Sequence, residues 1–229
     1  MKENNNILNT AYISLFVQLL IGLIGIHGIF IPLEENDAIL TDILILETTV
    51  QFIELSFYIW LTIQLSRMDF EVTYTRYFDW FISTPIMLLT TVFFMEYMTT
   101  KEDEEKIVTI SSILNEDLYT VLKIVFANFL MLLFGFLAEI KIISRVIGFI
   151  FGTAAFAYSF YLIYDEFVGE NIINKGLFYF MFIVWGLYGV AFLFPYVTKN
   201  ISYNFLDIIS KNFYGLFLYY VILKTSNYM

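Results

Sequence analysis

Seven long apolar segments, separated by short polar stretches, run along the chain. Each is about 20 to 25 residues long, enough for a helix to cross the roughly 30 Å of bilayer hydrocarbon. Backbone polar groups in lipid must bond within their own segment, which favours helices, and no segment shows the alternation of a membrane β-strand. The expected spans cover residues 8–32, 40–64, 74–98, 118–138, 144–165, 176–198 and 203–224. The pattern predicts an all-α membrane protein, a bundle of seven transmembrane helices.

The polar stretches between these segments are expected to be loops. They lie at 34–37, 67–71, 101–117, 139–144, 165–175 and 199–202. The first apolar segment is too long for the core of a signal peptide, so we count it as a span. No repeat or soluble domain is visible, and the chain stops five residues after the last segment. We therefore expect residues 1–229 to form a single transmembrane domain with no fused signalling domain.

Composition narrows the class of protein further. Hydrophobic residues make up 59% of the chain, whereas about 45–50% is usual for soluble domains. The absence of cysteine and the single histidine exclude thiolate and multi-histidine metal sites, so we expect no metal. A net charge of −10 argues against nucleic acid, which requires a basic surface. We expect the lipid bilayer as partner and no enzymatic activity.

Several ionisable residues fall deep inside the expected spans. A charge at the centre of the bilayer costs about 2.5–3.5 kcal/mol on insertion scales, so each is a candidate functional residue. Lys123 lies close to the end of its segment, and its long side chain can reach the surface. The deep candidates are Glu47, Glu54, Arg76, Asp79, Asp207 and Lys211.

Four of these residues are spaced for contact along their own helices. Asp207 and Lys211 are four residues apart, and Arg76 and Asp79 are three apart, so each pair shares a helix face. One interpretation is structural, with buried ion pairs holding the helices together. Desolvation offsets most of the attraction in such pairs, which makes this interpretation the less attractive one.

The second span carries a narrow polar stripe about three turns long. Small and polar residues in the first span, such as Gly22 and Gly25, are explained by helix packing. Two glutamates on one stripe exceed what packing requires, so we favour a hydrated path along the second helix. The stripe consists of Glu47, Gln51, Glu54 and Tyr58, and Ser14 and Gln18 form a shorter one on the first span.

Three segments resemble microbial (type I) rhodopsins. The run from Arg76 to Pro85 resembles the family motif R-Y-x-D-W-x-x-T-T-P and departs from it only at Ser83. The run from Leu206 to Lys211 is similar to the family's D-x-x-x-K motif, whose lysine binds retinal. The sixth segment is similar to the aromatic set W-x-x-Y-P-x-x-W, with Gly189 in place of the proline and Phe192 in place of the second tryptophan.

This resemblance implies a retinal-binding site. Lys211 would hold all-trans retinal covalently as a Schiff base. Asp79 and Asp207 would be its counter-ions, with Arg76 beside them, because a carboxylate stabilises a buried cation. Tyr58 would donate a hydrogen bond to Asp207. The residues implied to surround the polyene are Trp80, Thr84, Trp185, Tyr188 and Phe192.

A narrower resemblance is to the group 1 viral rhodopsins, which are known as light-gated cation channels. It is carried by the glutamates and glutamine of the second-span stripe and by Ser14, Asn204 and Asn212. It implies an ion pathway lined by these residues, with monovalent cations or protons as the transported ions. The wider resemblance to type I rhodopsins implies an outside N-terminus, which the distribution of charge leaves open. For a viral protein, the membrane would be that of the host cell.

Two absences favour a channel over a pump. Thr90 stands where proton pumps of the family commonly carry a donor carboxylate, and no carboxylate lies between Tyr196 and Leu206. An outward proton pump with Asp79 as acceptor remains the alternative, and a photosensor with a separate transducer is a third.

Glu54 lies two turns, about 10 Å, from Glu47. We expect it at the level of the Schiff base, so that its neutralisation lowers conductance and leaves the colour nearly unchanged.

Overall fold

The protein is a bundle of long helices. Its computed structural model describes residues 2–67, 71–101 and 107–226, with side chains from residue 5 onward. In this part of the chain there are no strands. The helices are α1 (Lys2–Ile29), α2 (Ile39–Arg67), α3 (Arg76–Thr100), α4 (Ile110–Glu139), α5 (Arg145–Ile163), α6 (Ile172–Phe192), α7 (Tyr196–Asp207) and α8 (Phe213–Thr225).

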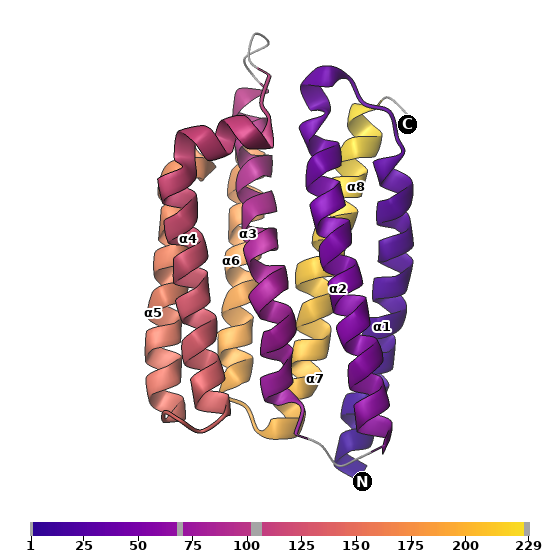
Figure 1. Ribbon diagram of the computed structural model, residues 1–229, viewed down its shortest axis with the longest axis vertical. Helices are drawn as coiled ribbons and strands as arrows, with labels where there is room; N and C mark the ends of the chain where they lie inside the picture. The colour runs from indigo at the N-terminus through magenta and orange to yellow at the C-terminus, as the bar shows by residue number, and fades with distance from the viewer. Residues whose placement is uncertain (1, 68–70, 102–106, 227–229) are drawn as a thin grey trace.

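Helices α7 and α8 together form the seventh rod of the bundle (Figure 1). A π-helical turn, Ile208–Asn212, joins them without a break in the rod. Short 3-10 turns precede α2 (Glu35–Asp37) and α3 (Thr73–Thr75), and a second π-helical turn (Tyr164–Val168) follows α5. The predicted seven-helix bundle is therefore confirmed.

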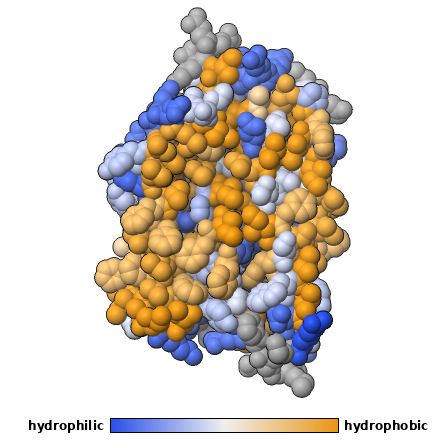
Figure 2. All heavy atoms as spheres, viewed as in Figure 1, coloured by the Kyte–Doolittle hydropathy of each residue, from blue (hydrophilic) through white to orange (hydrophobic). Residues whose placement is uncertain are grey.

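The bundle exposes apolar side chains on its outside and encloses both an apolar core and a set of buried polar side chains. Within the described residues, six of the seven rods are long and apolar enough to cross a membrane. The remaining one, α2, has a similar length of 29 residues, and its polar residues Glu47, Gln51 and Glu54 are buried in the bundle. Figure 2 shows hydrophobic residues along the middle of the molecule and hydrophilic ones gathered at its two ends. The protein is an integral, multi-pass membrane protein.

The end of the sixth helix and the start of the seventh differ from the prediction. Helix α6 ends at Phe192 instead of continuing to residue 198, and α7 begins at Tyr196. Pro195 separates them, because its ring cannot continue a helix and its preceding residue avoids the helical region. The predicted loop at 199–202 is therefore wrong. These residues lie in the first turns of α7, where Lys199 and Asn200 are buried.

The fourth helix starts earlier than the apolar pattern indicated. Thr109 caps it by accepting a hydrogen bond from the backbone of Ser112, so the helix begins at Ile110 instead of 118. Asp117 has non-helical backbone angles and marks a kink. The helical segment before the kink belongs to the stretch 101–117, which was predicted to be a loop because of its polar residues.

Helices α4 and α5 approach closely at one glycine. A Cβ atom built on Gly148 would lie 2.5 Å from the Cβ of Ala138 and 2.9 Å from the backbone oxygen of Phe134. Both neighbours are parts of helix α4 that cannot move aside independently. The close approach of the two helices therefore requires glycine at this position, as is common where membrane helices pack.

Candidate functional site

The amine of Lys211 lies at the centre of the bundle and faces carboxylates from two other helices. Its Nζ atom is 2.7 Å from Asp79 Oδ2 on α3 and 3.5 Å from Glu54 Oε1 on α2. Asp207, which shares a helix face with Lys211 by spacing, is not among its described ion-pair partners, which are Asp79 and Glu54. Lys211 stands in the π-helical turn, where the spacing of side chains differs from that of an α-helix.

Arg76 pairs across the bundle as well. Its Nη1 atom is 3.4 Å from Asp207 Oδ2, instead of pairing with Asp79 on its own helix. Asp207 also accepts hydrogen bonds of 2.7 Å from the hydroxyl groups of Tyr58 and Tyr188. The bond from Tyr58 is the one implied by the family motif. Asp207 is thus held by two phenols and a guanidinium, whereas Asp79 is bonded to the amine.

Two asparagines of α7 hold the guanidinium of Arg76. Asn200 Oδ1 accepts from Arg76 Nε at 3.1 Å, and Asn204 Oδ1 accepts from Nη2 at 2.5 Å. Asn204 also connects this cluster to α1, because its amide donates to Thr10 Oγ1 and its backbone oxygen accepts from Ser14. Asn200 was missed in the sequence because the expected loop included it. Its burial shows only once α7 is seen to begin at residue 196.

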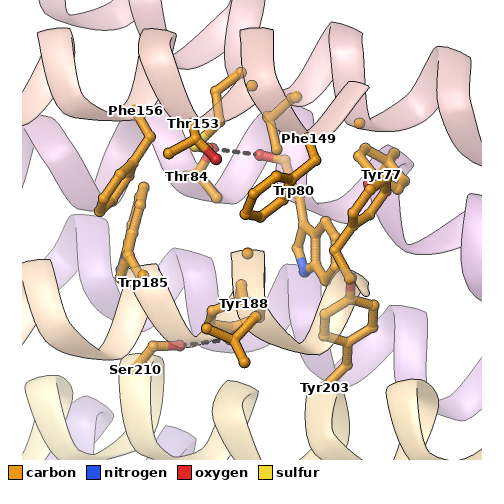
Figure 3. A pocket seen from close by; sticks show the side chains of 18 of the residues that line it. Tyr77, Trp80, Thr84, Phe149, Thr153, Phe156, Trp185, Tyr188, Tyr203 and Ser210 are labelled. Carbon is orange, nitrogen blue, oxygen red and sulfur yellow. Dashed lines mark hydrogen bonds between the residues drawn. The ribbon is translucent and has the colours of Figure 1, made fainter. Parts of the chain in front are cut away.

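A cavity of about 320 Å³ lies beside Lys211 (Figure 3). Its walls are almost entirely apolar, and the residues implied by the family motifs take part in them: Trp80, Thr84, Trp185, Tyr188 and Phe192. Helix α5 supplies Phe149, Thr153 and Phe156, which the motifs did not indicate. An apolar cavity of this size with one buried amine at its wall suits an apolar molecule that carries a single reactive carbonyl. The residues present therefore fit retinal.

A second set of buried polar groups follows α2 away from Lys211. Thr90 donates a hydrogen bond to Glu47, and both side chains are fully buried. The polar atoms of Gln51 and Asn212 are buried and have no hydrogen-bond partner among the described residues. Buried polar groups are almost always bonded, so such groups indicate a place for water or an ion. The stripe predicted on the second span thus lies inside the bundle. Tyr58 contacts Arg76, Glu54 contacts Lys211, and Glu47 bonds to Thr90 further along α2.

Apolar side chains close the bundle beyond Glu47. They fill the space toward the end where α1 stops and α2 begins, and each is 0–1% exposed: Leu40, Ile43, Leu44, Phe94, Leu218 and Ile222. At the rim beyond them, Tyr97 donates a hydrogen bond to Asp37, and Lys101 pairs with the same carboxylate at 3.0 Å. The polar stripe is therefore separated from this end of the molecule by an apolar barrier.

The chain belongs to the bacteriorhodopsin-like family. Residues 9–225, nearly the whole chain, match the family described as Bacteriorhodopsin-like protein. The predicted membership of the microbial rhodopsins is confirmed. Members of this family normally bind retinal through a Schiff base to a lysine, and they act as photoreceptors, ion pumps or channels.

Solved structures of the family share the whole fold. The crystal structure of viral rhodopsin OLPVRII is 27% identical, with a TM-score of 0.82, and the match covers 95% of this chain and 98% of that one. Thermophilic rhodopsin from Rubrobacter xylanophilus is 17% identical, with a TM-score of 0.75, over 96% and 98% of the two chains. The proton pumping rhodopsin AR2 from the marine alga Acetabularia acetabulum is 17% identical, with a TM-score of 0.73, over 98% and 97%. The last two show the fold alone. No curated protein matches the chain.

Proposed function

We propose that this protein carries all-trans retinal on Lys211 and acts as a light-gated cation channel of the kind found among group 1 viral rhodopsins. The observation that carries the proposal is the buried stripe of Glu47, Gln51 and Glu54, which leads from the Lys211 amine along α2. When bound, retinal supplies the absorption of light and a change of shape at the lysine.

The protein's own residues would hold and tune this group. Asp79 lies 2.7 Å from the amine and stabilises a positive charge there. Trp80, Trp185 and Tyr188 line the cavity and exclude water from it. Tyr58 and Arg76 hold Asp207 in place as a second negative charge near the site. A change of shape at Lys211 would therefore alter the hydrogen bonds that join Asp79, Arg76 and Asp207.

The ion pathway would follow the buried polar side chains. Acidic groups that line a path attract cations and repel anions. Gln51 and Asn212 offer buried oxygens and amides without partners, which can replace part of the hydration shell of a passing ion. The apolar barrier near Leu218 must open for conduction, so the conformation described here is the closed one. The side chains assigned to the pathway are Ser14, Glu47, Gln51, Glu54, Asn204 and Asn212.

An outward proton pump is the second candidate, because of the contact between Glu47 and Thr90. Thr90 occupies the position where pumps of the family commonly carry a donor carboxylate, and it donates a hydrogen bond to Glu47. A carboxylate from α2 thus lies next to the place where a pump would require one. In a pump, Asp79 would accept the proton and Glu47 would supply its replacement.

The direction of the photocurrent distinguishes the two candidates. Currents should be recorded under light at a series of voltages from cells that express the protein, with Lys211→Ala as the light-insensitive control. We expect the current to reverse at the equilibrium potential of the permeant ions and the reversal potential to shift when external sodium is replaced. A current that keeps one direction at all voltages would establish the pump instead, whereas a fall in Glu47→Gln is expected of both candidates.

We also propose that residues 1–229 form one transmembrane domain with its N-terminus outside. For a viral protein, the membrane concerned would be that of the host cell. In this orientation α7 begins at the outer face, and the apolar barrier lies toward the cytoplasm. The domain assignment is supported by the match of residues 9–225 to a single family.

A further inference from the structure

A buried ion pair outside the retinal site joins α4 to α7. Lys199 Nζ lies 2.6 Å from Glu139 Oε1, and the two side chains are only 2% and 6% exposed. The ammonium group also lies 5.5 Å from the centre of the Phe192 ring, which is part of the cavity wall. Both charged residues fall in stretches that the sequence indicated to be loops.

Each charge lies at the unfavourable end of its own helix. Glu139 is the last residue of α4, where the partial charge of the helix is negative, and Lys199 is in the first turn of α7, where it is positive. The turn after Glu139 also places Lys141 at a φ of 64°, a backbone conformation that non-glycine residues rarely adopt. Neither charge is stabilised by the dipole of its own helix, and what the ion pair does join is the end of α4 to the start of α7.

The residues that follow Lys199 hold the guanidinium of Arg76. Asn200 accepts from Arg76 through its side chain at 3.1 Å and through its backbone oxygen at 3.4 Å, and Asn204 accepts one turn later. Arg76 in turn reaches Asp207. The first turns of α7 thus determine where the positive charge of Arg76 stands.

The other partner stands behind the cavity wall. Gly135 is one turn before Glu139 on α4, and a Cβ built on it would lie 2.6 Å from the Tyr77 hydroxyl. Both Gly135 and Tyr77 line the cavity. The end of α4 is therefore in close contact with α3 through Tyr77, which also contacts the ring of Phe136, and the ion pair attaches α7 to this contact.

We propose that Lys199 and Glu139 are positioning residues: their ion pair fixes the first turns of α7 to the end of α4 and thereby sets the place of the Arg76 guanidinium beside Asp207. The proposal goes beyond the proposed function, because it applies equally to a channel and to a pump. If the ion pair only stabilised the contact between α4 and α7, its loss would lower stability without changing the surroundings of Arg76.

Four variants separate these two roles. Lys199→Met and Glu139→Gln each leave one charge buried alone, which is strongly destabilising. The combined variant Lys199→Met/Glu139→Gln removes both charges and avoids that penalty, so it keeps the test valid if the single variants fail to fold. The exchanged variant Lys199→Glu/Glu139→Lys restores a pair and places each charge at the favourable end of its helix.

The readouts use the retinal-free protein, so they do not depend on the pigment or on transport. The chain has three arginines, and Arg67 and Arg145 are exposed. The NMR signal of the protected Nε–H of Arg76 can therefore be assigned with Arg76→Lys. Hydrogen exchange of the amides of residues 200–204 reports on α7. Glu170→Gln is the matched control, because the pair of Glu170 with Lys175 is an exposed ion pair at the opposite end of α6.

We expect the neutral double variant to fold, to displace the Arg76 signal and to speed exchange in α7 by about tenfold or more, as for a segment that opens locally. The exchanged variant should restore both readouts, and Glu170→Gln should change neither. A folded neutral variant whose Arg76 signal and exchange match the wild type would overturn the proposal. So would an exchanged variant that folds with Arg76 still displaced. A failure of retinal binding or of photocurrent would contradict the proposed function and leave this test unaffected.

Discussion

Lys211 and Asp79 are 132 residues apart in the chain, yet the amine of one donates a hydrogen bond of 2.7 Å to the carboxylate of the other. Both side chains are almost completely buried. A charge in this environment requires a partner, because water is not available to solvate it. The pair therefore defines the centre of the site and carries the first two predictions.

Lys211→Ala should abolish retinal binding. Lys211 lines the apolar cavity, and the family normally attaches retinal through the amine of a lysine. Purified protein reconstituted with all-trans retinal should show a visible absorption band, and the variant should show none. Lys224→Ala, at the far end of α8, serves as the control and should keep the band. A band that persists in Lys211→Ala would contradict the assignment.

Asp79→Asn should disturb the pigment more than Asp207→Asn. Loss of one partner of a buried charge pair costs about 3–5 kcal/mol, and Asp79 is bonded to Lys211, whereas Asp207 is bonded to two tyrosines and Arg76. We expect a red shift of the band, or loss of the protonated pigment near neutral pH. Absorption spectra over a pH series measure this. Identical spectra for wild type and Asp79→Asn would assign the counter-ion role to Asp207.

Glu54→Gln should lower the photocurrent and also shift the colour. The sequence led us to expect Glu54 at the level of the Schiff base with little effect on colour, but Glu54 Oε1 lies 3.5 Å from the Lys211 amine. At this distance the carboxylate acts directly on the positive charge. Glu47→Gln should lower the current with little change in the band, because Glu47 is bonded to Thr90. Spectra and currents that are unchanged in Glu54→Gln would exclude Glu54 from both the pathway and the counter-ion cluster.

Gly148→Ala should destabilise the protein, whereas Gly176→Ala should not. The added methyl group at position 148 would meet Ala138 at 2.5 Å and the backbone oxygen of Phe134 at 2.9 Å, while nothing lies within 4 Å at position 176. Overpacking of this kind typically costs about 1–3 kcal/mol. Thermal unfolding of the two variants measures the difference. Equal midpoints would show that α4 and α5 separate easily to admit the methyl group.

The sequence predicts the general plan of this protein well, because lipid imposes strong rules. Seven spans, the lysine proposed to carry retinal and both aspartates follow from apolar length and from motifs in the third and seventh spans. The ion pairs do not follow, because spacing along one helix suggests partners within that helix. In the structure Lys211 and Arg76 instead find carboxylates on neighbouring helices.

The other errors have a common cause. Polar residues near the end of a span look like a loop when the chain is considered in one dimension. Asn200, Lys199 and Glu139 are polar because they bond to one another or to Arg76 inside the bundle. Only the position of Pro195, which ends one helix and precedes the next, hinted that the residues after it were helical.

The π-helical turn at Ile208–Asn212 allows the backbone of the seventh rod to rearrange locally. One more residue is accommodated here than an α-helix would hold, and such turns are frequent at functional sites. The extra residue can be accommodated at a neighbouring position if backbone hydrogen bonds exchange, and the length of the rod does not change. Because Lys211 stands within this turn and Asn200 and Asn204 stand before it, a shift of the backbone hydrogen bonds here would turn the amine relative to Asp79 and leave the bonds to Arg76 in place.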